Sequence, residues 1–257
     1  MVAITETLPI SRSLSGENSK YTAGLIGLGR IGAEFLDSHL NAYLNNPRIK
    51  LDALCDLDQR KISVVKRIGY FSDDGLTFVQ RWPVDILSIC TPPSTHRALV
   101  VASAPYVKAI WLEKPIAETL EDADEIIRVC RHYNVLLQVN HQRRATKPKF
   151  TFSRGWLNTG THAVDLLRQY FGEVHAAFKD CIIFKSGQIV DIEYIDSQEP
   201  MFRLEVEHSQ EMMLPKMLED IIWALDTGTP LYSPGEEARE TLRVVLEMER
   251  DYETPDN

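Results

Sequence analysis

The chain has 257 residues, of which 44% are hydrophobic and 25% charged, and its formal net charge is −9 at pH 7. This length allows one large core or two modest ones, and typical domain sizes favour two small domains. The negative charge, with no large basic field, argues against nucleic acid as a partner.

Cysteine spacing and hydropathy both indicate a protein of the cytoplasm. No window approaches the ~18 consecutive apolar residues that a membrane span needs. We therefore expect no membrane contact. We also expect no metal site. The four cysteines are far apart and form no CxxC pair, which is typical of free thiols in a reducing compartment: Cys55, Cys90, Cys130 and Cys181.

The first half of the chain has the pattern of a parallel sheet. Residues 1–20 are polar, with no continuous apolar run, and we interpret them as a flexible tail. From residue 21, short β-rich runs alternate with longer amphipathic segments, as in a sheet with crossover helices. This order predicts a doubly wound parallel sheet over residues 21–142. The expected strands are TAGLIG, KLDALCD, VDILSIC, KAIWLE and VLLQVN.

Two segments between these strands have helical periodicity. After Thr119, a predicted N-cap with Asp122 at the capping-box position, a helix places four residues on one face: Ala123, Ile126, Ile127 and Cys130. After the first strand, another helix does the same with Leu36, Leu40, Tyr43 and Leu44.

The character of the sequence changes after Arg144. A polar stretch leads to a predicted helix over residues 162–172 and then to strand-like runs at 174–184, 188–195 and 201–208. Two helical patterns, at 215–227 and 235–251, end the chain. Strands followed by helices predict a small α+β domain over residues 143–257.

The stretch GLIGLGRIGAEF, residues 24–35, places three glycines between a strand and a helix. Such a GxGxxG pattern is either a phosphate cradle or only a glycine-rich turn. Asp56 follows Gly32 by 24 residues, at the end of the second strand, where a carboxylate can accept hydrogen bonds from an adenosine ribose. This spacing favours the cradle, in which Gly27 makes the turn, Gly29 admits a pyrophosphate and Gly32 lets the helix pack on the strand.

Two charged side chains bear on the choice of cofactor. Arg30 stands in the first turn of the helix, where a cation opposes the macrodipole unless an anion is bound, although it could equally point into solvent. Asp56 would repel a 2′-phosphate, so we expect NAD in preference to NADP. The alternative for Asp56 is a turn residue at the end of a strand.

The segments VDILSICTPPSTH, residues 84–96, and WLEKPIAETLEDADEI, residues 111–126, follow this glycine loop. Together they resemble the glucose-fructose oxidoreductase and inositol dehydrogenase family, often called Gfo/Idh/MocA. The resemblance covers residues 21–144 almost continuously. It implies a Rossmann domain followed by a domain with an open-faced sheet, and reversible hydride transfer between a sugar or cyclitol carbon and NAD(P).

The resemblance also implies roles for single residues. Lys114 of the EKP motif would lie by the nicotinamide and the reacting hydroxyl, and it follows a strand at the edge where open α/β sheets bind ligands. Partial burial would lower its pKa and make it a better proton relay. The alternatives are a surface Lys114 before a proline, and a His96 that is only a polar residue early in a helix. The cofactor would be bound by Gly27, Gly29, Arg30, Ile31, Gly32, Asp56, Thr91, Pro92, Pro93, His96 and Glu113.

A second motif, GWLNTGTHAVDLLRQYFGEV at residues 155–174, resembles the family's D-x-G-x-H-x-x-D segment. By this resemblance, His162 and Asp165 join Lys114 as catalytic residues, and His162 would polarise or deprotonate the substrate hydroxyl. We assign Asn158 and Arg144 to substrate binding. The alternative for His162 is a histidine whose bonds are satisfied in the core.

The chain departs from the family pattern in two ways. Asn158 stands where an aspartate is common, and an amide cannot ionise. Lys114 and His162 are only 48 residues apart, where relatives usually carry an extra helix and strand. A second domain of ~110 residues should have a narrow sheet, which leaves apolar strand residues short of cover and predicts a homodimer or homotetramer through that sheet. The alternative is a monomer in which the two C-terminal helices and the Rossmann domain cover these residues. The residues concerned are Ile182, Phe184, Ile192, Tyr194, Phe202, Leu204 and Val206.

These patterns predict an NAD-dependent oxidoreductase that acts on a hydroxyl of a sugar, nucleotide-sugar or cyclitol. Two alternatives stay open. The shortened second domain and Asn158 favour a catalytically silent dinucleotide-binding or regulatory homologue. An NAD-assisted lyase or glycosidase would use the same hydride acceptor and the same two residues, Lys114 and His162.

Overall fold

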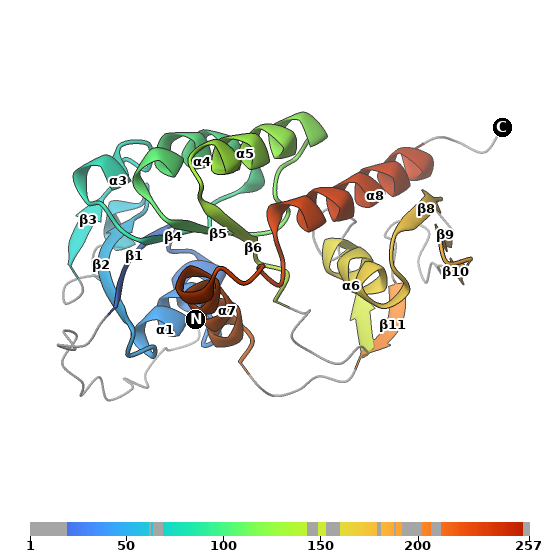
Figure 1. Ribbon diagram of the computed structural model, residues 1–257, viewed down its shortest axis with the longest axis horizontal. Helices are drawn as coiled ribbons and strands as arrows, with labels where there is room; N and C mark the ends of the chain where they lie inside the picture. Colours follow the sequence, from blue (N-terminus) through green and yellow to red (C-terminus); the bar gives the residue numbers. More distant parts are fainter. Residues whose placement is uncertain are drawn as a thin grey trace.

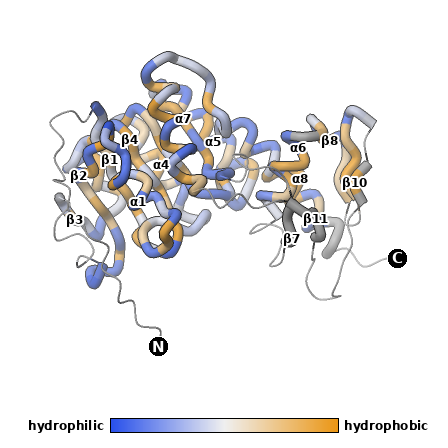
Figure 2. The backbone as a smooth tube through the Cα atoms, turned by 90° about the horizontal axis from the view of Figure 1, so that it is seen from below, coloured by the Kyte–Doolittle hydropathy of each residue, from blue (hydrophilic) through white to orange (hydrophobic). Residues whose placement is uncertain are grey.

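The computed structural model describes residues 20–61, 63, 69–142, 149–152, 160–178, 181–187, 189–191, 202–206 and 212–253. The expected tail, residues 1–20, lies outside this part except for Lys20. The described residues form a larger group around a parallel sheet and a smaller group around short antiparallel strands (Figure 1). Hydrophobic stretches occur in both groups (Figure 2).

The larger group is built on a six-stranded parallel sheet with the strand order β3-β2-β1-β4-β5-β6. Because the chain runs from β1 outward to β3 and then crosses back to β4, the sheet is doubly wound and all carboxyl ends meet at one edge. The sequence predicts five of the strands, and the structure confirms them; β3, with three residues, is too short for a period to be read. The strands are β1 (Tyr21–Ile26), β2 (Ile49–Cys55), β3 (Tyr70–Ser72), β4 (Ile86–Ile89), β5 (Ala109–Leu112) and β6 (Leu136–Val139).

Helices cover both faces of this sheet (Figure 1). One face carries α3 (Phe78–Arg81), α4 (His96–Ser103) and α5 (Leu120–His132), and the other carries α1 (His39–Leu44) and α7 (Leu214–Thr227). The predicted cap of α5 is confirmed, because Thr119 Oγ1 accepts a hydrogen bond of 3.2 Å from the Asp122 backbone N–H. Three short 3₁₀ turns complete this part, at Gln59–Lys61, Pro93–Thr95 and Ala104–Tyr106.

The helix expected after the glycine loop is interrupted, which corrects the sequence prediction. A five-residue π-helix, η1 (Arg30–Glu34), is followed by bends, and α1 begins only at His39. Leu36 lies in the bend and is 69% exposed, so it does not share a buried face with Leu40. Asp37 explains the break, because its carboxylate accepts hydrogen bonds from the Met213 and Leu214 backbone N–H groups at the start of α7.

Helix α7 packs with the parallel sheet, although its sequence lies in the second half of the chain. Its buried side chains share one hydrophobic cluster with β1, β2 and α1. Full burial of an aliphatic side chain contributes about 1.5–3 kcal/mol, so this face of α7 gives a strong preference for the sheet. The residues that form this face are Leu214, Met217, Leu218, Ile221 and Ile222.

The smaller group contains α6 (Thr161–Phe171) and a three-stranded antiparallel sheet, as the sequence predicts for an α+β domain. Ile182 and Phe184 point into a cluster with α6 and α8 (Gly235–Glu253) and are buried. The expectation that these two need cover from another subunit is therefore wrong. Ile192 and Tyr194, and the side chains of Phe202, Leu204 and Val206, lie outside the described part. The strands are β8 (Val174–Ala177), β9 (Cys181–Phe184) and β10 (Ile189–Asp191), with a separate ladder of β7 (Lys149–Phe152) and β11 (Phe202–Val206).

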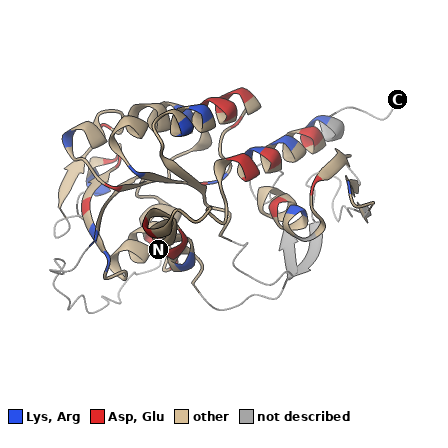
Figure 3. Ribbon diagram, in the orientation of Figure 1, with Lys and Arg blue, Asp and Glu red and all other residues tan. Residues whose placement is uncertain are grey.

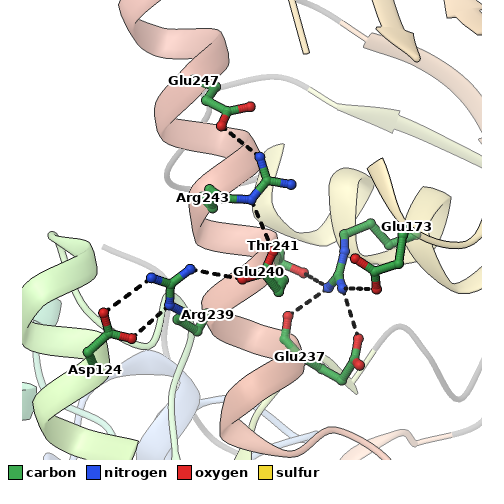
Figure 4. A network of polar contacts seen from close by, with 9 residues as sticks. Asp124, Glu173, Glu237, Arg239, Glu240, Thr241, Arg243 and Glu247 are labelled. Atoms are coloured by element: carbon green, nitrogen blue, oxygen red, sulfur yellow. Dashed lines mark hydrogen bonds and ion pairs between the residues drawn. The ribbon is translucent and has the colours of Figure 1, made fainter. Parts of the chain in front are cut away.

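Helix α8 joins the two groups. Ala238 and Leu242 pack in the cluster that contains α5, whereas Val244, Val245 and Met248 pack in the cluster that contains α6. Its outer surface alternates in charge (Figure 3). Helix α8 also makes polar contacts with both groups (Figure 4). Arg239 of α8 pairs with Asp124 of α5 at 2.7 Å, and Arg168 of α6 donates a hydrogen bond of 3.1 Å to Thr241 of α8.

Candidate active site

The glycine loop after β1 has the three local features that a phosphate cradle needs. Gly27 has φ +92°, and a Cβ there would lie 2.7 Å from the Cys90 carbonyl oxygen. A Cβ on Gly32 would lie 2.0 Å from the Gly27 carbonyl oxygen, so only glycine lets η1 approach the strand this closely. At Gly29, in contrast, no atom lies within 4 Å of the Cβ position, and the residue is exposed. The loop is therefore closed at its two ends and open in the middle.

Arg30 and Ile31 follow this opening with different environments. Arg30 is exposed, and its guanidinium carbon lies 4.8 Å from the centre of the Phe35 ring. Ile31 is half-buried and packs against the cluster beneath the loop. Arg30 thus has room to meet an anion at Gly29, while Ile31 contributes to the packing that supports the loop.

Asp56, at the end of β2, is bonded directly to the glycine loop. Its Oδ2 accepts a hydrogen bond of 2.7 Å from the Leu28 backbone N–H, and its Oδ1 accepts one of 2.8 Å from the Asp58 backbone N–H. Each carboxylate oxygen has a second lone pair, so two acceptor positions are left beside the loop. The structure therefore brings together Asp56 and the glycines, as the sequence spacing predicts.

The loop after β4 contains Thr91 and Pro92 at its surface and His96 in its interior. Thr91 Oγ1 lies 2.7 Å from Thr95 Oγ1, and Pro92 is exposed before the 3₁₀ turn Pro93–Thr95. His96 is fully buried, with Nε2 2.9 Å from the Thr91 carbonyl oxygen and Nδ1 3.2 Å from the Ile116 carbonyl oxygen. Burial lowers the pKa of His96, although the two carbonyl contacts act in the opposite direction. His96 therefore connects two loops through its ring nitrogens, and its side chain has no exposed surface.

The EKP motif follows β5 at the same edge of the sheet. Glu113 is buried, and its Oε1 lies 3.0 Å from His39 Nε2 and accepts a hydrogen bond from the Asn140 amide. Burial raises the pKa of Glu113, but His39, Asn140 and the charge of Lys114 together lower it below its ordinary value. Glu113 is therefore an anion in the core. Lys114 beside it is half-buried, and the Lys114–Pro115 peptide bond is cis.

The start of α6 brings His162 and Asp165 to a third residue that the sequence analysis missed. His141, the second residue after β6, lies with Nδ1 3.7 Å from Asp165 Oδ2, and its ring is perpendicular to the His162 ring at 6.0 Å. Asp165 also accepts a hydrogen bond of 3.2 Å from the Thr241 hydroxyl of α8. The three residues near Asp165, which are His141, His162 and Thr241, are all buried. A usable signal was present, because His141 follows a strand at the carboxyl edge of the sheet, the same rule that singled out Lys114.

The two residues expected to bind substrate, Arg144 and Asn158, lie outside the described part of the chain. Among the residues that the structure describes, no three His, Cys, Asp or Glu side chains are grouped so that they could hold a metal ion. Within the same ranges, none of the helices combines the length and the apolar character needed to cross a membrane.

Residues 21–141 match the model of the GFO_IDH_MocA family, which is described as an oxidoreductase family with an NAD-binding Rossmann fold. The likeness to the Gfo/Idh/MocA family therefore extends over the parallel-sheet half of the chain. This confirms the family expected from the EKP and glycine motifs, and it confirms NAD as the cofactor of the matched family. The match ends where the parallel sheet ends, one residue short of the predicted boundary at 142.

Curated Gfo/Idh/MocA relatives align with the same half of the chain. The uncharacterized oxidoreductase YrbE of Bacillus subtilis is 29% identical over 124 residues, which are 47% of this chain and 35% of that protein. Myo-inositol 2-dehydrogenase of Thermotoga maritima is 30% identical over 124 residues, 47% of this chain and 36% of that protein. The matched segment thus spans little more than a third of the length of these relatives.

Solved Gfo/Idh/MocA structures share the fold over most of the chain. The WlbA dehydrogenase from Bordetella pertussis, solved in complex with NADH and UDP-GlcNAcA, has a TM-score of 0.71 at 16% identity and covers 93% of this chain and 100% of that chain. Scyllo-inositol dehydrogenase from Lactobacillus casei, with bound NAD(H) and scyllo-inositol, has a TM-score of 0.71 at 13% identity and covers 91% and 97%. At these identities the likeness establishes the fold, a Rossmann sheet followed by an α+β part.

Proposed function

We propose that this chain is an NAD-dependent oxidoreductase that moves a hydride between the nicotinamide and a hydroxyl-bearing carbon of a sugar, nucleotide-sugar or cyclitol. The observation that carries the proposal is the glycine loop, which is open at Gly29, is bonded to Asp56, and lies at the sheet edge where Lys114 also stands. A dinucleotide bound there would extend along the edge from Asp56 toward Lys114.

The residues of the loop fit a dinucleotide. The open position at Gly29 would admit the pyrophosphate, which Arg30 is placed to neutralise. The two remaining lone pairs of Asp56 would accept the ribose hydroxyls. When bound, NAD would supply the hydride acceptor. Thr91 and Pro92, at the surface of the next loop along the edge, would line the nicotinamide side.

Side chains of this protein would accept the proton of the substrate hydroxyl. As the substrate carbon loses its hydride, its hydroxyl must lose a proton, and a positioned base raises the rate of such a step by a factor of about 10²–10⁴. We assign Lys114 and His162 to this task, with Asp165 orienting the imidazole. In the reverse direction, the same two side chains would return the proton to the substrate oxygen.

The relatives support a polyol or sugar substrate, since they include proteins named inositol and apiose dehydrogenases. A second candidate, a dinucleotide-binding protein without catalysis, is favoured by the two departures from the family pattern: Asn158 and the short sequence between Lys114 and His162. A third candidate, NAD-assisted bond cleavage or hydration, is favoured by a relative named 2,7-anhydro-N-acetylneuraminate hydratase from Escherichia coli, which is 29% identical over 125 residues.

Two measurements separate these candidates. The first is calorimetric titration of the purified chain with NAD, NADH and NADP, which tests the cradle. The second is incubation with NAD and a panel of inositols, sugars and nucleotide-sugars, with absorbance of the reduced cofactor as the readout. Net reduction supports the oxidoreductase. Substrate loss without net reduction supports the third candidate, and NAD binding with no turnover of any kind supports the second.

A further inference from the structure

A buried network of polar side chains lies beneath the EKP loop, and the chemistry proposed above does not use it. Its centre is His39, the first residue of α1, which is fully buried. His39 Nδ1 lies 2.9 Å from Ser88 Oγ, and His39 Nε2 lies 3.0 Å from Glu113 Oε1. The centre of the His39 ring lies 3.8 Å from that of Trp111. Burying this many polar atoms costs free energy unless each finds a partner, so the arrangement is specific.

The hydrogen bonds of this buried network can be assigned in one direction, from Tyr43 through Ser88 and His39 to Glu113. Glu113 is an anion and can only accept, so His39 Nε2 carries the hydrogen. His39 Nδ1 can then accept from the Ser88 hydroxyl. Tyr43, whose hydroxyl lies 2.7 Å from Ser88 Oγ, keeps its proton because burial raises its pKa. It can therefore donate to Ser88 when the Ser88 hydrogen is directed to His39.

Glu113 is held from three directions by this arrangement. His39 approaches from α1, the Asn140 amide approaches from the end of β6, and the Glu113 backbone N–H donates to the Ile89 carbonyl oxygen at 2.9 Å. The next residue is Lys114. Fixing both the side chain and the backbone of Glu113 leaves the backbone of Lys114 little freedom to rotate.

We propose that His39 is a positioning residue for Lys114 and acts through Glu113. This proposal rests on the proposed function, in which Lys114 exchanges a proton with the substrate. His39 lies seven residues after Gly32, so it connects the segment that follows the glycine loop to the loop that carries the base. A displacement of ~1 Å at a reacting group can lower the rate by about 10²-fold, so a fixed Glu113 has a catalytic consequence.

Two substitutions separate positioning from packing. His39→Gln places an amide N–H near the Nε2 position, which retains the bond to Glu113 and removes the bond to Ser88. His39→Asn places its amide near the Nδ1 position, which retains the bond to Ser88 and removes the bond to Glu113. Both variants lose the ring that contacts Trp111, so a purely structural role predicts equal effects. Positioning predicts that only H39N misplaces Lys114.

The first readout does not need a substrate. Brief acetylation with acetic anhydride, followed by mass spectrometry of the peptides, gives the relative reactivity of Lys114, with Lys108, the residue before β5, as the internal reference. We expect at least a threefold change at Lys114 in H39N, and less in H39Q. Equal reactivity at Lys114 in wild type and H39N would overturn the proposal. Should H39N not fold, H39F retains an aromatic ring but has no donor, and its Lys114 must then show the change.

The second readout uses whichever substrate the panel identifies. H39N should lower kcat by tenfold or more without changing the KM for NAD, and H39Q should stay within threefold of wild type. Equal losses in the two variants would overturn positioning in favour of packing. If wild type reduces no NAD with any substrate, the proposed function fails, but the acetylation comparison still decides whether His39 acts on Lys114.

Discussion

Asn140 and His141 follow each other at the carboxyl end of β6, and their side chains contact opposite halves of the candidate site. The Asn140 amide donates a hydrogen bond to Glu113, beside Lys114, whereas His141 Nδ1 lies 3.7 Å from Asp165 Oδ2, one turn from His162. The end of one strand thereby connects the half of the site built on the sheet to the half built on α6. Because neither contact is local in sequence, only the fold brings these residues together.

The contact between His141 and Asp165 leads to a first prediction, which needs no substrate. Free energies of unfolding for His141→Ala, Asp165→Asn and the double variant should be non-additive by about 1 kcal/mol, since residues in contact couple by 0.5–3 kcal/mol. Urea denaturation followed by circular dichroism measures this. As a matched control, His175→Ala, at an exposed position of β8, should combine with Asp165→Asn additively. Additivity in the His141 cycle would show that the two side chains do not interact.

A second prediction concerns Asp56 and the choice of cofactor. The carboxylate is held beside the glycine loop by the Leu28 backbone N–H, so a 2′-phosphate would meet a fixed negative charge. Wild type should bind NADH at least tenfold more tightly than NADPH in calorimetric titration, and Asp56→Ser should narrow this difference. Asp58→Ser, which removes the neighbouring half-buried carboxylate that pairs with Arg60, is the control and should leave the preference unchanged. Tighter binding of NADPH by wild type would refute this role of Asp56.

Buried His96 gives a third prediction, about pH and stability. Burial lowers the pKa of His96 in the folded protein, whereas an unfolded chain protonates histidine below a pH of about 6.5. Between these two values the unfolded state binds more protons, so the free energy of unfolding falls as the pH falls through this window. Urea denaturation at pH 7.5 and 5.5 should therefore show a smaller loss of stability in His96→Gln than in wild type. His132→Gln, at an exposed position at the end of α5, should lose as much as wild type. An equal loss of stability in all three proteins would show that His96 does not cause this pH dependence.

The sequence predicts the parts of this fold that depend on local chemistry. The glycine loop, the apolar strands and the Thr119 cap each have their cause within a few residues, and each is found in the structure. The break before α1 has its cause far away, because Asp37 leaves the helical pattern to bond the start of α7, 176 residues further along the chain. No periodicity within residues 30–44 contains that information.

The same limit applies to the candidate site. Lys114 and Asp56 follow the carboxyl ends of strands, where open α/β sheets bind ligands, so the sequence identifies them as candidates. His39, in contrast, resembles an ordinary polar residue on a surface helix. Its partners Ser88 and Glu113 are 49 and 74 residues away, so its burial is a property of the assembled sheet. His96 illustrates the opposite case, because the resemblance places it by the cofactor and the fold turns its ring toward two backbone carbonyls.

The catalytic assignment gives the last prediction, for which β5 supplies its own control. Lys114 follows the carboxyl end of β5, and Lys108 precedes its amino end, at the opposite edge of the sheet, where it pairs with Asp85 at 2.8 Å. Lys114→Ala should lower kcat on the order of 100-fold or more, because a proton-transferring group is lost, and should leave the Kd for NAD nearly unchanged.

Lys108→Ala removes the same charge next to the opposite end of β5. It breaks only an exposed ion pair, worth about 1 kcal/mol or less, and should retain wild-type turnover. His162→Ala should behave like Lys114→Ala, with exposed His175→Ala as its control. Steady-state kinetics and calorimetric titration on the four variants test the assignment. If Lys114→Ala and Lys108→Ala lower kcat equally, the effect comes from net charge or stability, and the base must be sought elsewhere at the sheet edge, with His141 as the next residue to replace.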